Sequence, residues 1–199
     1  ASDVYKRQGQ GSSGQLAGGN SVSQSSLIQC LPAAVKWQSV YTGNLCTFAI
    51  SQDGKLYATG AGTNGQLGLG DAVARNTFVA IGTDNNWIEF SGYAPIGLKG
   101  DGTIWVWGNG SSGQMANNAV LNASSPIQVG SDKTWAKVAS SQSAYAAMTT
   151  AGEIWVWGSN TLGQLGQNNT ISYSSIVQTI MGSNLWFDVQ GLLDSFLMF

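Results

Sequence analysis

Apolar and polar residues alternate along this chain in short segments, and the segments recur about every 50 residues. One segment of each repeat opens with tryptophan, continues through mostly polar positions and closes on an apolar residue. It occurs at 37–40, 87–90, 135–138 and 186–189. Such short, β-prone runs predict the first strand of each repeat.

Two further apolar runs follow, joined by a turn that ends in glycine. The turns contain Asp53-Gly54, Asp101-Gly102 and Ala151-Gly152. Glycine adopts positive φ without steric cost, so these turns predict hairpins between a second and a third strand. The paired runs are 46–51 with 55–59, 96–99 with 103–107, and 145–149 with 153–157.

The third strand is apolar on both of its faces, as in Ile104-Trp105-Val106-Trp107. Alternate side chains of a strand point to opposite faces, so this run requires a packed layer on each side. A fourth, β-branched run closes each repeat, at 27–29, 78–81, 127–129 and 176–180. No segment has a helical period with caps, which predicts essentially no helix.

A glycine-glutamine phrase follows the third strand of every repeat. Its glutamines, Gln15, Gln66, Gln114 and Gln164, are 51, 48 and 50 residues apart. A constant period indicates an array of equal units. Each unit then has four antiparallel strands in about 50 residues and is apolar on both faces. Stacking such sheets face to face around an axis buries both faces of each sheet. The predicted fold is an all-β propeller of four-stranded antiparallel blades.

The segment 101–109 (Asp-Gly-Thr-Ile-Trp-Val-Trp-Gly-Asn), followed by Gly113-Gln114-Met115, resembles the repeat of the regulator of chromosome condensation family. The segments 154–166 and 60–70 match the same pattern, and the resemblance extends over residues 9–199. It implies a propeller, usually of about seven blades. The expected units are three whole repeats, 37–86, 87–134 and 135–185, with partial repeats at 9–36 and 186–199.

The partial repeats lead us to expect an open arc of about half a circle, cut from a longer array and exposing blade faces at both ends. Residues 1–8 do not match the repeat and resemble a translated sequencing-adapter scar, so we expect them to be a non-native leader outside the propeller domain.

Composition narrows the function. Charged residues make up 9% of the chain, with 8 Lys plus Arg against 10 Asp plus Glu. These are too few cations for a basic face that neutralises nucleic-acid phosphates, so no nucleic-acid partner is expected. No apolar run is long enough to span a membrane. Histidine is absent, which removes the commonest general base and metal ligand, so neither an enzyme nor a cofactor or metal site is expected. Cys30 and Cys46 fit a disulfide, a buried pair or two separate core positions.

Two motifs with a chemical interpretation are better explained by structure. The glycine-glutamine phrase lacks the Lys-Ser or Lys-Thr and the helix of a nucleotide-binding loop, and Asp53 and Asp101 are expected to shape turns rather than form a carboxylate pair. The phrase is therefore expected to join one blade to the next, its glutamines bonding buried backbone groups. The structural positions are Gly65, Gln66, Gly113, Gln114, Gly163 and Gln164.

The variable loops after the phrase are the expected partner-binding surface, because loops on a rigid scaffold carry function. The candidate residues are Asn117, Asn118, Asn122, Asn168 and Asn169. The predicted function is a non-catalytic propeller that binds a protein partner. The alternative is a glycan-binding or surface-adhesion module of a bacterium or phage, which the low charge and the Ser, Asn and Gln content also suit. An enzyme would need a catalytic group from outside this chain.

Overall fold

The computed structural model describes residues 6–131, 134–180, 188–191 and 195–198. These residues form 16 β-strands and no helix, as the sequence predicts. Three four-stranded antiparallel sheets make up most of the molecule. They are a first blade of β3 (Trp37–Thr42), β4 (Cys46–Ser51), β5 (Leu56–Gly60) and β6 (Arg75–Ala80), a second of β7 (Trp87–Ser91), β8 (Ile96–Lys99), β9 (Ile104–Gly108) and β10 (Ala123–Gln128), and a third of β11 (Trp135–Ser140), β12 (Ala144–Thr149), β13 (Ile154–Gly158) and β14 (Tyr173–Gln178).

A two-stranded sheet lies on each side of the three blades. One pairs β1 (Lys6–Gly9) with β2 (Gln24–Gln29), and the other pairs β15 (Val189–Gly191) with β16 (Phe196–Met198). β1 begins inside the segment 1–8 that the sequence assigned to a leader, and Arg7 donates a hydrogen bond to the carbonyl of Gln15 at 2.7 Å. Residues 6–8 therefore belong to the folded array.

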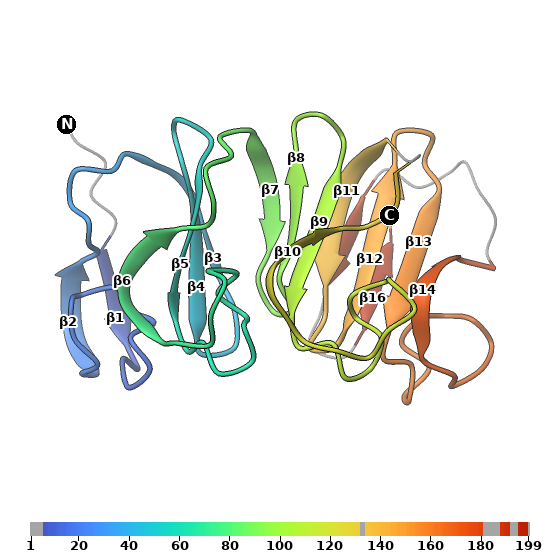
Figure 1. The fold of residues 1–199 in the computed structure, drawn as a ribbon, viewed down its shortest axis with the longest axis horizontal. Helices are drawn as coiled ribbons and strands as arrows, with labels where there is room; N and C mark the ends of the chain where they lie inside the picture. The colour runs from blue at the N-terminus through green and yellow to red at the C-terminus, as the bar shows by residue number, and fades with distance from the viewer. Residues whose placement is uncertain (1–5, 132–133, 181–187, 192–194, 199) are drawn as a thin grey trace.

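The blades stand next to one another as the sheets of a propeller do, and they do not close into a ring (Figure 1). First strands of neighbouring sheets pack together, β7 with β11 and β11 with β15. The expected all-β propeller of stacked four-stranded blades, with partial units on both sides and an open arrangement, is confirmed. The fourth strands start earlier than predicted, because their polar first halves still pair with the third strands, as Arg75 does with Gly60.

The third strands are buried on both faces, as predicted from their apolar runs. Trp107 and Trp157 are completely buried, and the first-strand residues Trp37, Trp87 and Trp135 are at most 4% exposed. Trp186, which the sequence placed in the same series, lies outside the described residues. Tryptophan therefore fills the space between the blades, where each large ring excludes water from two sheets.

The connections divide between two opposite faces of the array (Figure 1). We call one the loop face: it consists of residues 10–23, 43–45, 61–74, 92–95, 109–122, 141–143 and 159–172. We call the other the hairpin face: it consists of the turns 52–55, 100–103 and 150–153 and the links 30–36, 81–86 and 129–131. In the view of Figure 1 the hairpin face is at the top.

The glycine-glutamine turns lie where one blade meets the next. The indole N–H of Trp107, in the second blade, donates to the carbonyl of Gln66 in the first at 3.0 Å, and Trp157 does the same to Gln114. Gly113 has φ +82°, and a Cβ added there would lie 2.6 Å from the Cα of Ser174 in the following blade. Glycine is required here by both its backbone conformation and the close approach.

The two cysteines are separate buried thiols. Cys30 Sγ donates to the carbonyl of Leu16 at 3.5 Å and Cys46 Sγ to that of Ala61 at 3.2 Å. Burial raises the pKa of the Cys46 thiol to about 12. Of the three alternatives left open by the sequence, the structure has two unrelated core positions.

Candidate binding site on the loop face

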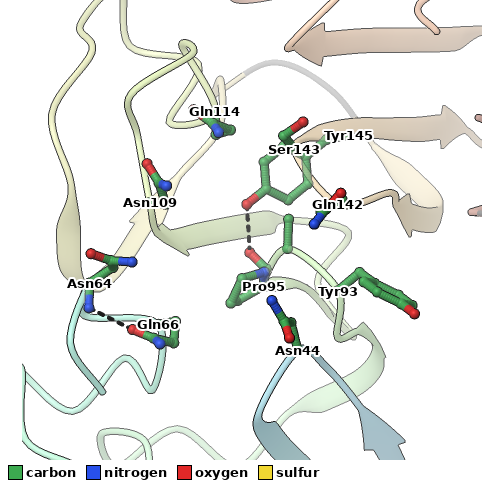
Figure 2. Close-up of a pocket in the computed structure, with 11 residues that line it drawn as sticks. Asn44, Asn64, Gln66, Tyr93, Pro95, Asn109, Gln114, Gln142, Ser143 and Tyr145 are labelled. Atoms are coloured by element: carbon green, nitrogen blue, oxygen red, sulfur yellow. Dashed lines mark hydrogen bonds between the residues drawn. The ribbon is translucent and has the colours of Figure 1, made fainter. Parts of the chain in front are cut away.

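A pocket of about 330 Å³ opens on the loop face. Its lining is dominated by carboxamide side chains from three blades, which surround the opening in Figure 2. We call it the amide pocket. Its lining residues are Asn44, Asn64, Gln66, Tyr93, Ala94, Pro95, Asn109, Gln114, Gln142, Ser143 and Tyr145.

Two kinds of connection supply all of these residues except Tyr145, which lies in β12. The short links between first and second strands, 43–45, 92–95 and 141–143, carry Asn44, Tyr93 and Gln142, while the glycine-glutamine turns carry the rest of the carboxamides. The floor is held by Tyr145, whose hydroxyl donates to the carbonyl of Pro95 in the neighbouring blade at 3.4 Å (Figure 2). Complete burial raises the pKa of Tyr145, so its hydroxyl stays protonated and remains a donor. The floor of the pocket is thus fixed by the fold.

Some of the carboxamides are already used by their own turns. Gln66 Oε1 accepts from the backbone N–H of Asn64 at 2.7 Å, and Gln114 Oε1 accepts from that of Ser112 at 2.6 Å. These bonds close the turns within one repeat rather than bridging blades. The contact between blades instead uses the glutamine backbone carbonyls.

Asn44 and Gln142 are different. Both are exposed, and neither makes a hydrogen bond to another residue in the described part of the chain. They come from the first and third blades, on either side of the second-blade link 92–95. Their donors and acceptors are therefore free for a bound molecule.

No charged side chain lines the amide pocket. Among the described residues of the loop face, Asp71 is the only charged one, and its carboxylate is 2.6 Å from the guanidinium of Arg75. The backbone N–H of Val73 and the Arg75 side chain hold the pKa of Asp71 below its usual value. Apart from this ion pair, the described part of the loop face is therefore uncharged.

The five asparagines predicted from the sequence lie on the same face but do not line the pocket. Asn118 and Asn168 have φ +61° and +57° at the position that Gly19 and Gly70 occupy in the preceding repeats. Asparagine is among the residues that best tolerate this left-handed conformation. The two residues thus continue the glycine position of the repeat.

The other three predicted asparagines bond within their own loops. Asn122 Oδ1 accepts from Gly110 N–H at 3.0 Å, as Ser172 Oγ does from Asn160. Asn117 and Asn169 each accept from the N–H two residues ahead, at 3.1 and 2.8 Å. These are side-chain turns that shape the loop.

Sequence reasoning missed Asn44, Tyr93 and Gln142 as site residues. The signal present in the sequence was their common position, in the three short links between first and second strands. The residue type at this position differs from repeat to repeat, so the links show no repeated motif like that of the longer loops. Only the packing of blades places the short links next to the turns.

The described residues contain no group of three or more His, Cys, Asp and Glu side chains that could hold a metal ion. Glu89, on the first strand of the second blade, has its pKa raised by burial, and Lys137 opposes that shift. It is not part of the amide pocket.

None of the described residues belongs to a helix long and apolar enough to cross a membrane.

Comparison with known proteins follows the same repeats. The model of the regulator of chromosome condensation (RCC1) repeat matches residues 101–148 and 151–179. The ultraviolet-B receptor UVR8 of Arabidopsis thaliana is 41% identical over 64 residues, covering 32% of this chain and 14% of UVR8. The regulator of chromosome condensation of Drosophila melanogaster is 54% identical over 33 residues, covering 17% of this chain and 6% of that protein.

Solved structures share the fold over nearly the whole chain. Human WBSCR16 superposes with a TM-score of 0.85 at 24% identity, covering 100% of this chain and 53% of its own. Prp20p from Saccharomyces cerevisiae gives 0.81 at 16% identity, covering 97% and 50%. The chain therefore spans about half the length of these two proteins and a smaller part of the curated relatives.

Proposed function

Because this chain carries RCC1 repeats and folds as an RCC1-like propeller, we propose that it is a non-catalytic scaffold that docks a protein partner on its loop face. Related propellers support this role: the Prp20p structure was studied together with its binding to Gsp1p and histones, and Kap60 has been solved bound to yeast RCC1 (Prp20). Those partners belong to those proteins.

The observation that carries the proposal is the asymmetry of the two faces. The loop face combines the amide pocket with exposed aliphatic side chains at one equivalent position in four successive repeats, which we call the aliphatic row. Large exposed apolar residues that recur at one position are typical of an interaction surface. The row is Val22 (57% exposed), Val73 (58%), Leu121 (72%) and Ile171 (65%).

The backbone holds the aliphatic row in place. A Cβ at Gly62 would lie 2.4 Å from the carbonyl oxygen of Val73, and one at Gly110 would lie 1.9 Å from that of Leu121. Each glycine thus lets the backbone of the residue with the exposed side chain pack closely against it. A preorganised row loses little conformational entropy when a partner covers it.

The test is a selection on immobilised protein with a phage-displayed library of protein fragments, run beside a glycan array. We expect fragments that bind the purified protein in solution and are lost when Leu121 and Val73 are both changed to serine. The matched control is Ile88→Ser with Ile180→Ser, two exposed aliphatic residues outside the loop face. Glycan binding without any fragment binding would contradict the proposal.

A further inference from the structure

On the premise that the loop face docks a protein, we propose that the amide pocket binds an extended, uncharged segment of the partner through its main-chain peptide groups. The pocket presents six carboxamides and no charge.

The chemistry of the lining favours peptide groups. A carboxamide carries one carbonyl acceptor and one NH₂ donor group, the same pair of functions as a peptide bond. Asn44 and Gln142 therefore match the backbone of any residue, whatever its side chain. Because they stand in different blades and have no partner among the described residues, they provide two separated anchoring points.

The absence of charge selects against charged segments. A charged side chain entering the pocket would lose hydration, and no opposite charge lines the pocket to compensate. Asp71, the charged residue among the described residues of the loop face, is already paired with Arg75. Neutral segments are therefore preferred, and binding depends little on salt.

The size of the pocket fits a strand of polypeptide rather than a folded domain. Its volume of about 330 Å³ lies at the lower end of the ~300–1,000 Å³ usual for ligand pockets. Its lining is drawn from three successive blades, so its occupant runs across the blade joints. An extended segment of a few residues has this shape, and the aliphatic row on the same face remains available for the rest of the partner.

The experiment uses three pools of synthetic, fluorescently labelled peptides of about eight residues, one uncharged, one acidic and one basic. Binding to the full chain is followed by fluorescence anisotropy at about 0.05 M and about 0.5 M salt. We expect the uncharged pool to bind best and its Kd to change less than about twofold between the two salt concentrations. N-methylation of the central peptide bonds should weaken binding about tenfold.

Variants locate the binding. Asn44→Ala and Gln142→Ala should each raise Kd about fivefold, the loss of one hydrogen bond. Their matched controls are Asn85→Ala and Gln52→Ala, exposed carboxamides on the hairpin face, which should leave Kd unchanged. Asn64→Asp keeps the shape of the side chain but adds a charge, so it should weaken the uncharged pool and favour the basic one.

Each other outcome overturns the inference. Preference for a charged pool, steep salt dependence, or insensitivity to N-methylation would remove main-chain recognition. A sugar that binds the same side chains in the glycan array would replace it. Protein fragments that bind the loop face while every peptide pool fails would overturn the inference and leave the scaffold role standing. Failure of both fragments and peptides would remove the scaffold role as well.

Discussion

On the hairpin face, the turn aspartates Asp53 and Asp101 are held by neighbouring side chains, whereas on the loop face two neutral carboxamides, Asn44 and Gln142, stand unpaired beside a pocket. Asp53 accepts from Ser51 Oγ at 2.5 Å and lies 3.0 Å from Lys55 Nζ. Asp101 accepts from both the backbone N–H and the hydroxyl of Thr103. Asn44 and Gln142 have no such partner among the described residues.

The difference separates structure from binding. Both faces are built from the same repeat, and on both of them hydrogen bonds join neighbouring blades. On the hairpin face the backbone N–H of Trp135 donates to the carbonyl of Gly102, and on the loop face the indole N–H of Trp157 donates to the carbonyl of Gln114. Polar groups that the fold already uses should matter to stability. Polar groups that it leaves unused should matter only to a partner.

The largest effect should come from the blade joint beneath the loop face. Gly113→Ala adds a Cβ 2.6 Å from the Cα of Ser174 at φ +82°, so backbone must move. We expect a loss of about 3 kcal/mol in the free energy of unfolding, measured by urea denaturation. Gly163→Ala, at φ +76° with no atom within 4 Å, is the control and should lose about 1 kcal/mol. Equal losses would mean that the close approach between blades is unimportant.

A buried cation should give the next effect. Lys99, 5% exposed at the edge of the hairpin face, has its Nζ 3.8 Å from the centroid of the Trp105 ring, 4.7 Å from that of Trp87 and 2.8 Å from Asp84 Oδ2. Lys99→Ala removes stem and charge and should cost about 2 kcal/mol, while Lys99→Met keeps the stem and should cost about 1 kcal/mol. Differential scanning calorimetry measures both.

Lys55→Ala serves as the surface control for Lys99, because Lys55 pairs with Asp53 in an exposed turn. Its loss should leave the melting temperature close to that of the parent protein, because an exposed ion pair contributes little to stability. If Lys99→Met were as stable as the parent protein, packing alone would account for this site. The charge would then be dispensable on the hairpin face.

Acid should weaken the molecule through the same turns. Hydrogen bonds from the Thr103 hydroxyl and backbone N–H lower the pKa of Asp101. The pKa of Asp53 is also lowered, mainly by the hydrogen bond from the Ser51 hydroxyl. A lowered folded pKa contributes stability above the unfolded value of about 4 and loses it as pH falls through the folded value. Asp101→Asn should therefore show a shallower fall in melting temperature between about pH 5 and pH 2.5.

Glu89 provides the opposite sign within the same titration. Burial raises its pKa, so its contribution to stability is greatest below the unfolded value and is lost as pH rises through the folded value. Glu89→Gln should thus steepen the acid-side fall that Asp101→Asn flattens. A variant pair that moved the curve in the same direction would contradict these assignments.

Much of the fold followed from the sequence, because each unit repeats its own local signals. The Trp-led strands, the Asp-Gly turns and the double-faced runs at Ile104 and Ile154 each predict the same blade. Strand starts were less accurate: β6 begins at Arg75, three residues before the predicted run. Polar residues there pair through the backbone, which apolar periodicity does not record.

The candidate site was harder to predict for a physical reason. Asn118 and Asn168 looked like exposed polar loop residues, but their backbone conformation makes them substitutes for glycine. Asn44 and Gln142 are about 100 residues apart and meet only because stacked blades align equivalent links. Sequence shows what each repeat contains, and packing decides which repeats share a pocket.

The smallest effect on stability should come from the residues most important for binding. Asn44→Ala and Gln142→Ala remove exposed side chains with no hydrogen bond to another described residue, so the free energy of unfolding should change by less than about 0.5 kcal/mol. Gln114→Ala is the sharp contrast, because Gln114 is 3% exposed and its Oε1 closes a turn at 2.6 Å. Its loss should cost about 1–2 kcal/mol, measured in the same urea series. If Asn44 and Gln142 proved as costly as Gln114, the fold would already use their side chains, and they would not be free binding groups on the loop face.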